Sequence, residues 1–241
     1  MPAVVGYGRK PDVLACGYCH LPTGNGRPEN ANIAGLSPEY IIEQVGDFKT
    51  GARSSALPER VPFAYMRMEA LSLGKADLTA AARYFTHLRP KSFLRVVEAA
   101  TVPKTYISGW ILAKVRGTAT EPIGERIVEV PDNLDQFELR DDRTSYTAYV
   151  PPGSIGQGKT LVLTGGEKTL PCTSCHGPDL KGVGTAPPIV GRSPSYIARQ
   201  LFDFKSGARG GTHNALMKPV VATLNGPDMI AIAAYLASNG P

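Results

Sequence analysis

The chain contains 241 residues, of which 20% are charged, and its formal net charge is +5. Lysines and arginines are scattered rather than gathered in runs, which argues against a nucleic-acid-binding protein. No stretch of about 18 consecutive apolar residues occurs, so we expect no transmembrane helix. A globular chain of this length forms either one large domain or two small ones.

Two copies of one short motif carry the most recognisable chemistry. Residues 16–20 read CGYCH and residues 172–176 read CTSCH, and together they contain all four cysteines. Zinc ribbons separate their cysteine pairs by roughly 15–20 residues, and neither zinc nor a redox-active dithiol gives the histidine a role. Covalent haem attachment uses every residue, because two cysteines form thioethers and the histidine binds the iron. We therefore predict two covalently bound haem c groups, held by Cys16, Cys19 and His20 and by Cys172, Cys175 and His176.

An internal repeat surrounds these motifs. Residues 37–53 (SPEYIIEQVGDFKTGAR) return as residues 193–209 (SPSYIARQLFDFKSGAR), 156 positions later, and the two motifs are separated by that same distance. Ser37 and Ser193 are predicted N-caps, each followed by proline. Later helices are expected near 77–87 and 228–238, now offset by 151 positions. The sequence thus predicts a mainly α protein with two homologous helical domains, residues 1–90 and 154–241.

Methionines at equivalent places in the two repeats are the predicted second iron ligands. The offset of 151 positions brings Met66 opposite Met217, and Met68 is the reserve for the first haem. Met229 lies on the apolar face of its helix and is interpreted as core. The two histidines outside the motifs, His87 and His213, are interpreted as surface residues, although either could replace a methionine. A thioether favours ferrous iron, so a histidine–methionine ligand pair raises the reduction potential.

Residues 91–153, called here the strap, differ in composition from both repeats. Segments rich in valine, isoleucine, threonine and aromatic residues alternate with prolines, which predicts short strands. The strap is too long and too apolar for a flexible tether, so we expect it to pack on one or both domains. Trp110, the only tryptophan, is interpreted as a packing anchor rather than a site residue.

The segments CTSCHGPDLKGVG, PPIVGRSPSYIARQLFDFKSGAR, LMKPVV and DMIAIAAYLAS resemble the class I c-type cytochromes, in particular their tandem two-haem members. The resemblance covers nearly all of the second domain and is weaker in the first. It implies iron ligated by the motif histidine and a downstream methionine, and a periplasmic location, with any signal peptide removed. It makes Arg53 and Arg209 candidates for haem propionate contacts, with a solvated arginine as the alternative. The family commonly has a proline where the second repeat has Pro187, but the first repeat has Ala31.

Three functional hypotheses follow. The first is an electron carrier that exchanges single electrons with redox partner proteins and does no bond chemistry itself. The second is the cytochrome subunit of a larger periplasmic dehydrogenase complex, for which the strap could be a docking surface. The third is a haem enzyme, such as a thiosulfate-oxidising dehydrogenase. Because both repeats offer a methionine at the same place, neither iron has an open position for a substrate, and this favours the carrier.

Overall fold

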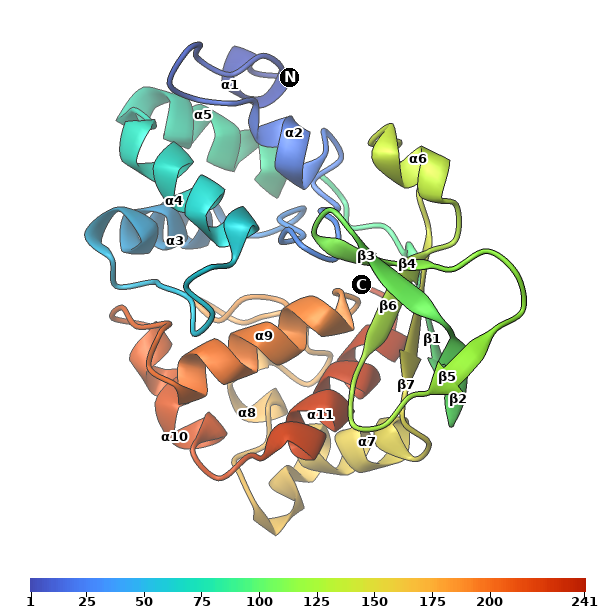
Figure 1. Ribbon diagram of the computed structural model, residues 1–241. Helices are drawn as coiled ribbons and strands as arrows, with labels where there is room; N and C mark the ends of the chain where they lie inside the picture. Colours follow the sequence, from blue (N-terminus) through green and yellow to red (C-terminus); the bar gives the residue numbers. More distant parts are fainter.

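The computed structural model describes residues 1–241 and contains two groups of helices with a β-rich layer along one side (Figure 1). The first group comprises α1 (Ala3–Gly6), α2 (Cys16–His20), α3 (Pro38–Thr50), α4 (Val61–Ser72) and α5 (Lys75–Thr86). The second comprises α7 (Ser154–Thr164), η1 (Gly165–Glu167), α8 (Thr173–His176), α9 (Pro194–Lys205), η2 (Asn214–Leu216), α10 (Met217–Val221) and α11 (Gly226–Ser238). None of these helices combines the length and the hydropathy needed to cross a bilayer.

The repeated block begins as its sequence predicts. The Oγ atoms of Ser37 and Ser193 each accept a hydrogen bond, at 3.2 Å, from the backbone N–H three residues later. A proline at the first helical position follows each cap, where its missing N–H costs no hydrogen bond. After α3 the chain turns at Gly51 in the left-handed region, with φ of 79°. The helix bounds therefore follow from local capping chemistry.

Each helical group has a separate hydrophobic core. Val45 and Phe48 of α3 pack with Phe85 of α5 in the first group. In the second group, Leu201 of α9 packs with Ile232 of α11. The apolar side chains of the repeated helices therefore face the interior of their own group, and the two groups share no common core.

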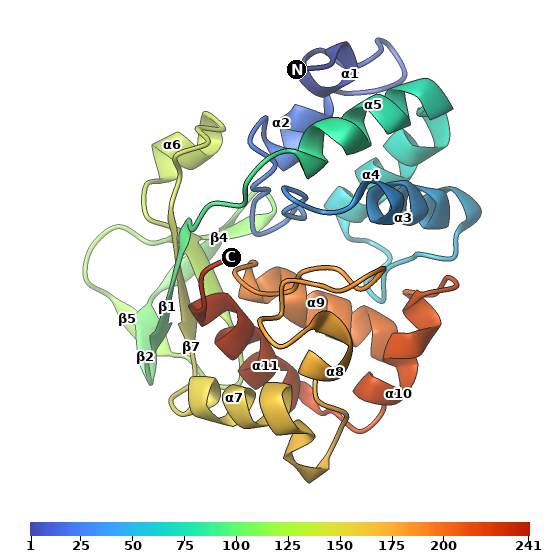
Figure 2. The ribbon, with the colours of Figure 1, turned by 180° about the vertical axis from the view of Figure 1, so that it is seen from behind.

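The strap forms a compact layer rather than an extended connection (Figure 2). Its elements are β1 (Leu94–Glu98), β2 (Thr101–Pro103), β3 (Thr105–Ser108), β4 (Ile111–Lys114), β5 (Thr120–Pro122), β6 (Val128–Pro131), α6 (Leu134–Glu138) and β7 (Tyr146–Val150). One sheet has the order β1-β7-β6, with β1 parallel to β7 and β6 antiparallel to it. The pairs β2–β5 and β3–β4 are antiparallel. The short strands expected from composition are present.

The strap packs on both helical groups, as predicted. Strand β1 lies against α11 of the second group, and β6 lies against α9. On the side of the first group, Arg140 donates from Nη1 to the carbonyl oxygen of Tyr18 at 2.6 Å. The Arg27 guanidinium lies over the Phe137 ring, 3.6 Å from its centroid. The strap therefore fixes the two groups to each other from one side.

The two helical groups also meet directly, through equivalent residues of the two repeats. Arg53 and Arg209 form an antiparallel β-bridge. Ser54 donates its backbone N–H to Ala208 O at 2.6 Å, and Gly210 donates to Ala52 O at 2.7 Å. Because the paired residues come from corresponding segments, the junction has approximate two-fold symmetry.

Two glycines of α7 allow a test of the helix packing in the second group. A Cβ on Gly158 would lie 1.9 Å from Ala231 O of α11, whereas a Cβ on Gly156 would meet nothing within 4 Å. We expect Gly158→Ala to destabilise the second group by about 1–3 kcal/mol or more, through overpacking. Gly156→Ala is the matched control and should stabilise it by about 0.5–1 kcal/mol. Denaturant unfolding measures both, and equal free energies of unfolding for the two variants would contradict the close packing of α7 on α11.

Candidate functional site

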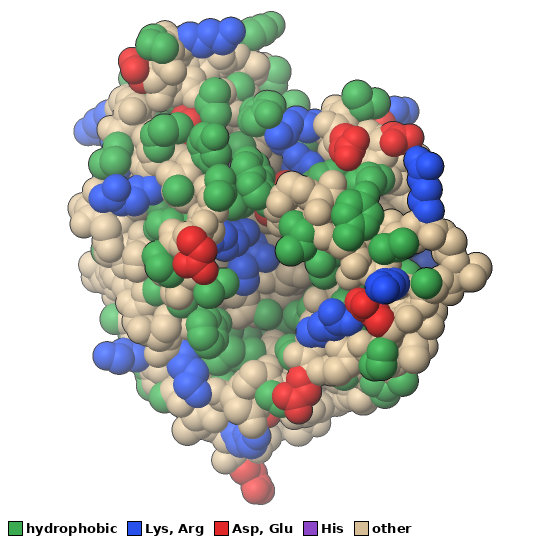
Figure 3. Space-filling view, viewed as in Figure 1, with side chains coloured by type: hydrophobic (Ala, Val, Ile, Leu, Met, Phe, Trp, Pro, Cys, Tyr) green, Lys and Arg blue, Asp and Glu red, His purple; other side chains and the backbone are tan.

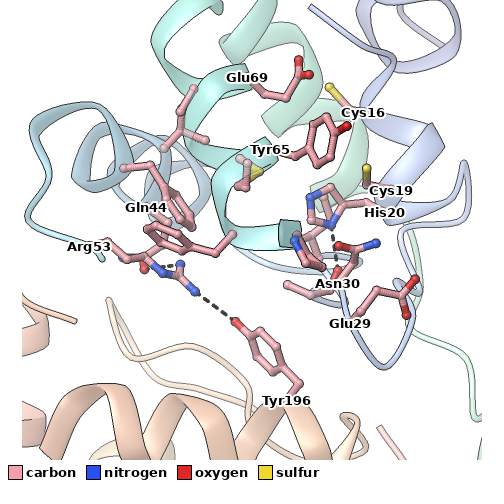
Figure 4. Close-up of a pocket in the computed structure, with 18 of the residues that line it drawn as sticks. Cys16, Cys19, His20, Glu29, Asn30, Gln44, Arg53, Tyr65, Glu69 and Tyr196 are labelled. Atoms are coloured by element: carbon pink, nitrogen blue, oxygen red, sulfur yellow. Dashed lines mark hydrogen bonds between the residues drawn. The ribbon is translucent and has the colours of Figure 1, made fainter. Parts of the chain in front are cut away.

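The first motif lies on one short helical turn. Cys16, Cys19 and His20 occupy positions i, i+3 and i+4 of α2, so the three side chains leave the same face of the helix. That face borders a cavity of about 580 Å³, which Met66 of α4 also lines. Figure 4 shows the two cysteines and His20 beside Tyr65 of α4, with Arg53 and Tyr196 below them. The sequence-predicted residues of the first repeat therefore meet in one cavity.

Both motif histidines are oriented by a backbone carbonyl. Nδ1 of His20 is 2.8 Å from Ala31 O, and Nδ1 of His176 is 2.7 Å from Pro187 O. A carbonyl oxygen can only accept, so Nδ1 carries the proton and Nε2 keeps a free lone pair for a metal. Burial lowers the pKa of both imidazoles, which favours this neutral form. Ala31 supplies the same contact as Pro187, because the bond uses main-chain oxygen.

The four cysteines are free thiols, three of them partly buried and Cys175 exposed. Neither pair forms a disulfide, and burial raises the pKa of Cys16 and of Cys172 to about 11. No group of three or more histidine, cysteine, aspartate or glutamate side chains comes together as a metal site. The two cysteine pairs thus do not combine into the four-cysteine zinc site considered from the sequence.

The methionines differ clearly in their surroundings. Met66 is half-buried and packs against the first core, and Met217 packs against the second core together with Cys172. Met68 is 46% exposed and does not line the cavity. Met229 is buried among the apolar residues of α11, as its helical position predicts. Burial and position thus favour Met66 and Met217, which the repeat offset places opposite each other.

The remaining histidines lie at the surface, as expected. His87 is exposed, and its Nδ1 is 2.7 Å from Arg83 O. His213 is also exposed, and its Nδ1 is 2.8 Å from a carboxylate oxygen of Glu43 in the other helical group. Neither side chain lines the cavity.

Arg209 is buried and Arg53 is partly buried between the two groups, so neither is a fully solvated arginine. Arg53 donates from Nη1 to Gln44 Oε1 and from Nη2 to Gln200 Oε1, each at 2.8 Å. Arg209 makes the symmetry-related bonds, to the same two glutamine oxygens at 2.8 Å. The tyrosine hydroxyls of Tyr196 and Tyr40 accept the last bond of each set. Arg53 lines the cavity; Arg209 does not.

Trp110 is a packing residue, as the sequence predicts, but it also lines the cavity, which was not expected. Trp110 lies in the turn between β3 and β4, packs against Tyr65 with ring centroids 5.8 Å apart, and lines the cavity. No local signal could have revealed this, because the contact joins the strap to α4. The space-filling view shows apolar side chains along a hollow between the first group and the strap, with basic side chains inside (Figure 3).

The cavity residues fit a haem group. Its volume lies within the range of about 300–1,000 Å³ usual for cofactor sites, and its lining is mainly apolar. Two thiols, one oriented imidazole and one thioether line it together. Buried nitrogens without a hydrogen-bond acceptor, Nε of Arg199 among them, indicate that an anionic group belongs between the two halves.

Comparison with known proteins agrees with this chemistry. Residues 157–240 match the sequence profile of the family described as cytochrome c. Cytochrome c-554(548) of Halomonas halodenitrificans is 35% identical over 75 residues, which are 31% of this chain and 90% of that protein. The chain belongs to the cytochrome c family.

Other cytochromes of this family match along almost the whole chain. Cytochrome c4 of Azotobacter vinelandii is 27% identical, over 97% of this chain and 87% of its own length. A thiosulfate dehydrogenase electron acceptor of Thiomonas intermedia (strain K12) is 28% identical, over 95% of this chain and 80% of its own length. The thiosulfate dehydrogenase TsdBA of Marichromatium purpuratum superposes with a TM-score of 0.66 and 26% identity. The match covers 98% of this chain but only 39% of that one.

These findings confirm the prediction of a tandem, mainly α class I cytochrome c. As a dihaem c-type cytochrome, the protein is an electron carrier with haem c as its cofactor.

The position of Trp110 gives a prediction that needs no mutation. Because it is the only tryptophan and lines the cavity, a haem there would accept its excitation energy and quench its emission. We expect weak tryptophan fluorescence from the native protein and a severalfold rise on unfolding in guanidinium. Native emission as strong as that of the unfolded chain would contradict this placement of the β3–β4 turn.

Proposed function

We propose that the protein carries two covalently bound haems, one in residues 1–90 and one in residues 154–241, and passes single electrons between redox partner proteins in the periplasm. The first haem would be attached to Cys16 and Cys19, with His20 and Met66 as axial ligands. The second would be attached to Cys172 and Cys175, with His176 and Met217. The observation that carries the proposal is the meeting of two thiols, an oriented imidazole and a thioether in one apolar cavity.

When bound, haem supplies a one-electron couple between ferric and ferrous iron. The chain's own residues set the conditions for it. Ala31 O and Pro187 O hold the histidine Nδ1 protons, so that each Nε2 keeps a lone pair that would bind the iron. Met66 and Met217 would supply a neutral, soft thioether to the iron, which would leave no coordination place for a substrate. The apolar walls exclude water, and rigid walls keep the reorganisation on electron transfer small.

A second candidate role is that of an electron-accepting partner of a dehydrogenase. It is supported by the relative named as a thiosulfate dehydrogenase electron acceptor, which matches 95% of this chain. In that role the oxidised protein would be reduced by thiosulfate only when a thiosulfate dehydrogenase is also present. Reduction by thiosulfate alone, with turnover, would instead favour an enzyme.

Covalent attachment is tested by mass. Each motif offers two thiols for thioether bonds, so denatured protein should have the mass of the polypeptide plus two haems. Replacing both cysteines of one motif by serine should remove one haem and leave the other. Loss of all haem into acidified organic solvent from the unaltered protein would contradict the proposal.

The axial ligand of the first haem is tested by a matched pair of methionines on α4. Met66→Ala should remove about half of the far-red absorption band that arises from sulfur-to-iron charge transfer. Met68→Ala should leave the band intact, because that side chain is 46% exposed and lies outside the cavity lining. The reverse result would assign the ligand to Met68.

A further inference from the structure

Three partly buried arginines at the junction between the two halves have no carboxylate within ion-pair distance. Arg53, Arg60 and Arg199 all line the first cavity. No ion pair in the structure involves any of them. Burial lowers the pKa of Arg199 to about 10, and repulsion by Arg60 adds to the effect. A partly buried guanidinium group without an ion-pair partner is costly, so this place suits an anionic group.

The hydrogen bonds of Arg60 and Arg199 leave donors unused. Arg60 donates from Nη2 to Glu29 O at 2.8 Å, and Arg199 donates from Nη2 to Pro28 O at 2.6 Å. Both bonds go to neutral carbonyl groups. Nε of Arg199 is buried and has no acceptor at all. The two guanidinium groups therefore reach the same loop from opposite halves of the molecule and keep free N–H groups beside the cavity.

The neighbouring carboxylates form no ion pair with Arg199, although Oε2 of Glu29 and Oε1 of Glu69 are buried without a hydrogen-bond partner. Glu29 forms an ion pair with Arg27 at 3.2 Å. Asp203 accepts from the backbone N–H of Ala56 at 3.0 Å and from Gln200 Nε2 at 3.4 Å. Glu69, at the other end of the cavity, accepts from Leu14 N at 2.8 Å. These contacts leave the unpaired N–H of Arg199 without an acceptor.

We propose that Arg199 and Arg60 bind the propionate carboxylates of the first haem, so that the second half of the molecule supplies a residue to the haem of the first half. The proposal rests on the haem assignment above. Propionates are the charged substituents of haem, and arginine matches a carboxylate through paired N–H donors. Arg53 is less available, because its Nη1 and Nη2 atoms already bond Gln44, Gln200 and Tyr196.

The second haem has no equivalent of Arg199. The offset of 156 positions brings Arg199 opposite Glu43, which contacts His213 at 2.8 Å. The two halves therefore place opposite charges at corresponding positions. A cation near haem disfavours the additional positive charge of ferric iron, so the first haem has the higher reduction potential and is reduced first.

The experiment is a spectroelectrochemical titration of the intact protein with both haems attached. Met66→His, which exchanges the soft ligand for a harder one, lowers the potential of the first haem and so assigns its wave. Arg199→Gln should then lower the equilibrium constant for reduction of that haem by about tenfold, as expected for one partly buried unit charge. It should also make the potential depend more strongly on pH, because a propionate without its cationic partner has a higher pKa.

Three further variants separate this role from a structural one. Arg199→Lys keeps the charge and should restore most of the potential. Arg67→Gln removes the same charge from the exposed face of α4, outside the cavity lining, and should leave both waves in place. Arg60→Gln should lower the first wave in the same way, and it serves as the test if Arg199→Gln does not fold.

Unchanged waves in Arg199→Gln, or an equal shift of both waves, would overturn the inference. Such results would leave the haem assignment intact if the mass still corresponds to two haems. Absence of covalent haem from the unaltered protein would instead overturn the proposed function itself.

Discussion

Burial of arginine between the two halves is the interaction on which the arrangement of the molecule depends. Arg53 and Arg209 each donate to glutamine oxygens of both repeats, so neither half completes its hydrogen bonds alone. A guanidinium group without these acceptors would be a buried and unsatisfied cation, which is expensive. The bonds therefore fix the relative position of two cores that share no apolar residues.

The approximate two-fold symmetry at this junction does not extend to every residue. Duplication gives both halves the same histidine–carbonyl bond and the same capping serine, so the two motif histidines are oriented alike. Differences arise only where the repeats diverge, as at Glu43 and Arg199. Any chemical difference between the two sites thus depends on residues that the two repeats do not share.

Much of the fold could be predicted because its signals are local and occur twice. The caps at Ser37 and Ser193, the helices after them and the burial of Met229 depend on neighbours within a few residues. The strands of the strap were expected from composition, but not their pairing, because β1 and β7 are far apart in the chain. Trp110 and Arg199 were missed as site residues for a similar reason. Each lines the cavity from a different part of the chain, and the sequence pattern of one repeat cannot predict such a contact.

Because β1 pairs in parallel with β7, the two ends of the strap lie side by side. The length of the strap therefore does not allow the two halves to move apart. Leu94 to Glu98 follow the first half, Tyr146 to Val150 precede the second, and the five residues pair in register. The two halves are therefore joined by the hydrogen bonds between β1 and β7. The chain between these two strands is a loop to one side of this connection. Electron tunnelling weakens steeply with distance, so this clamp would hold the exchange between the centres at one rate whether or not a partner is docked.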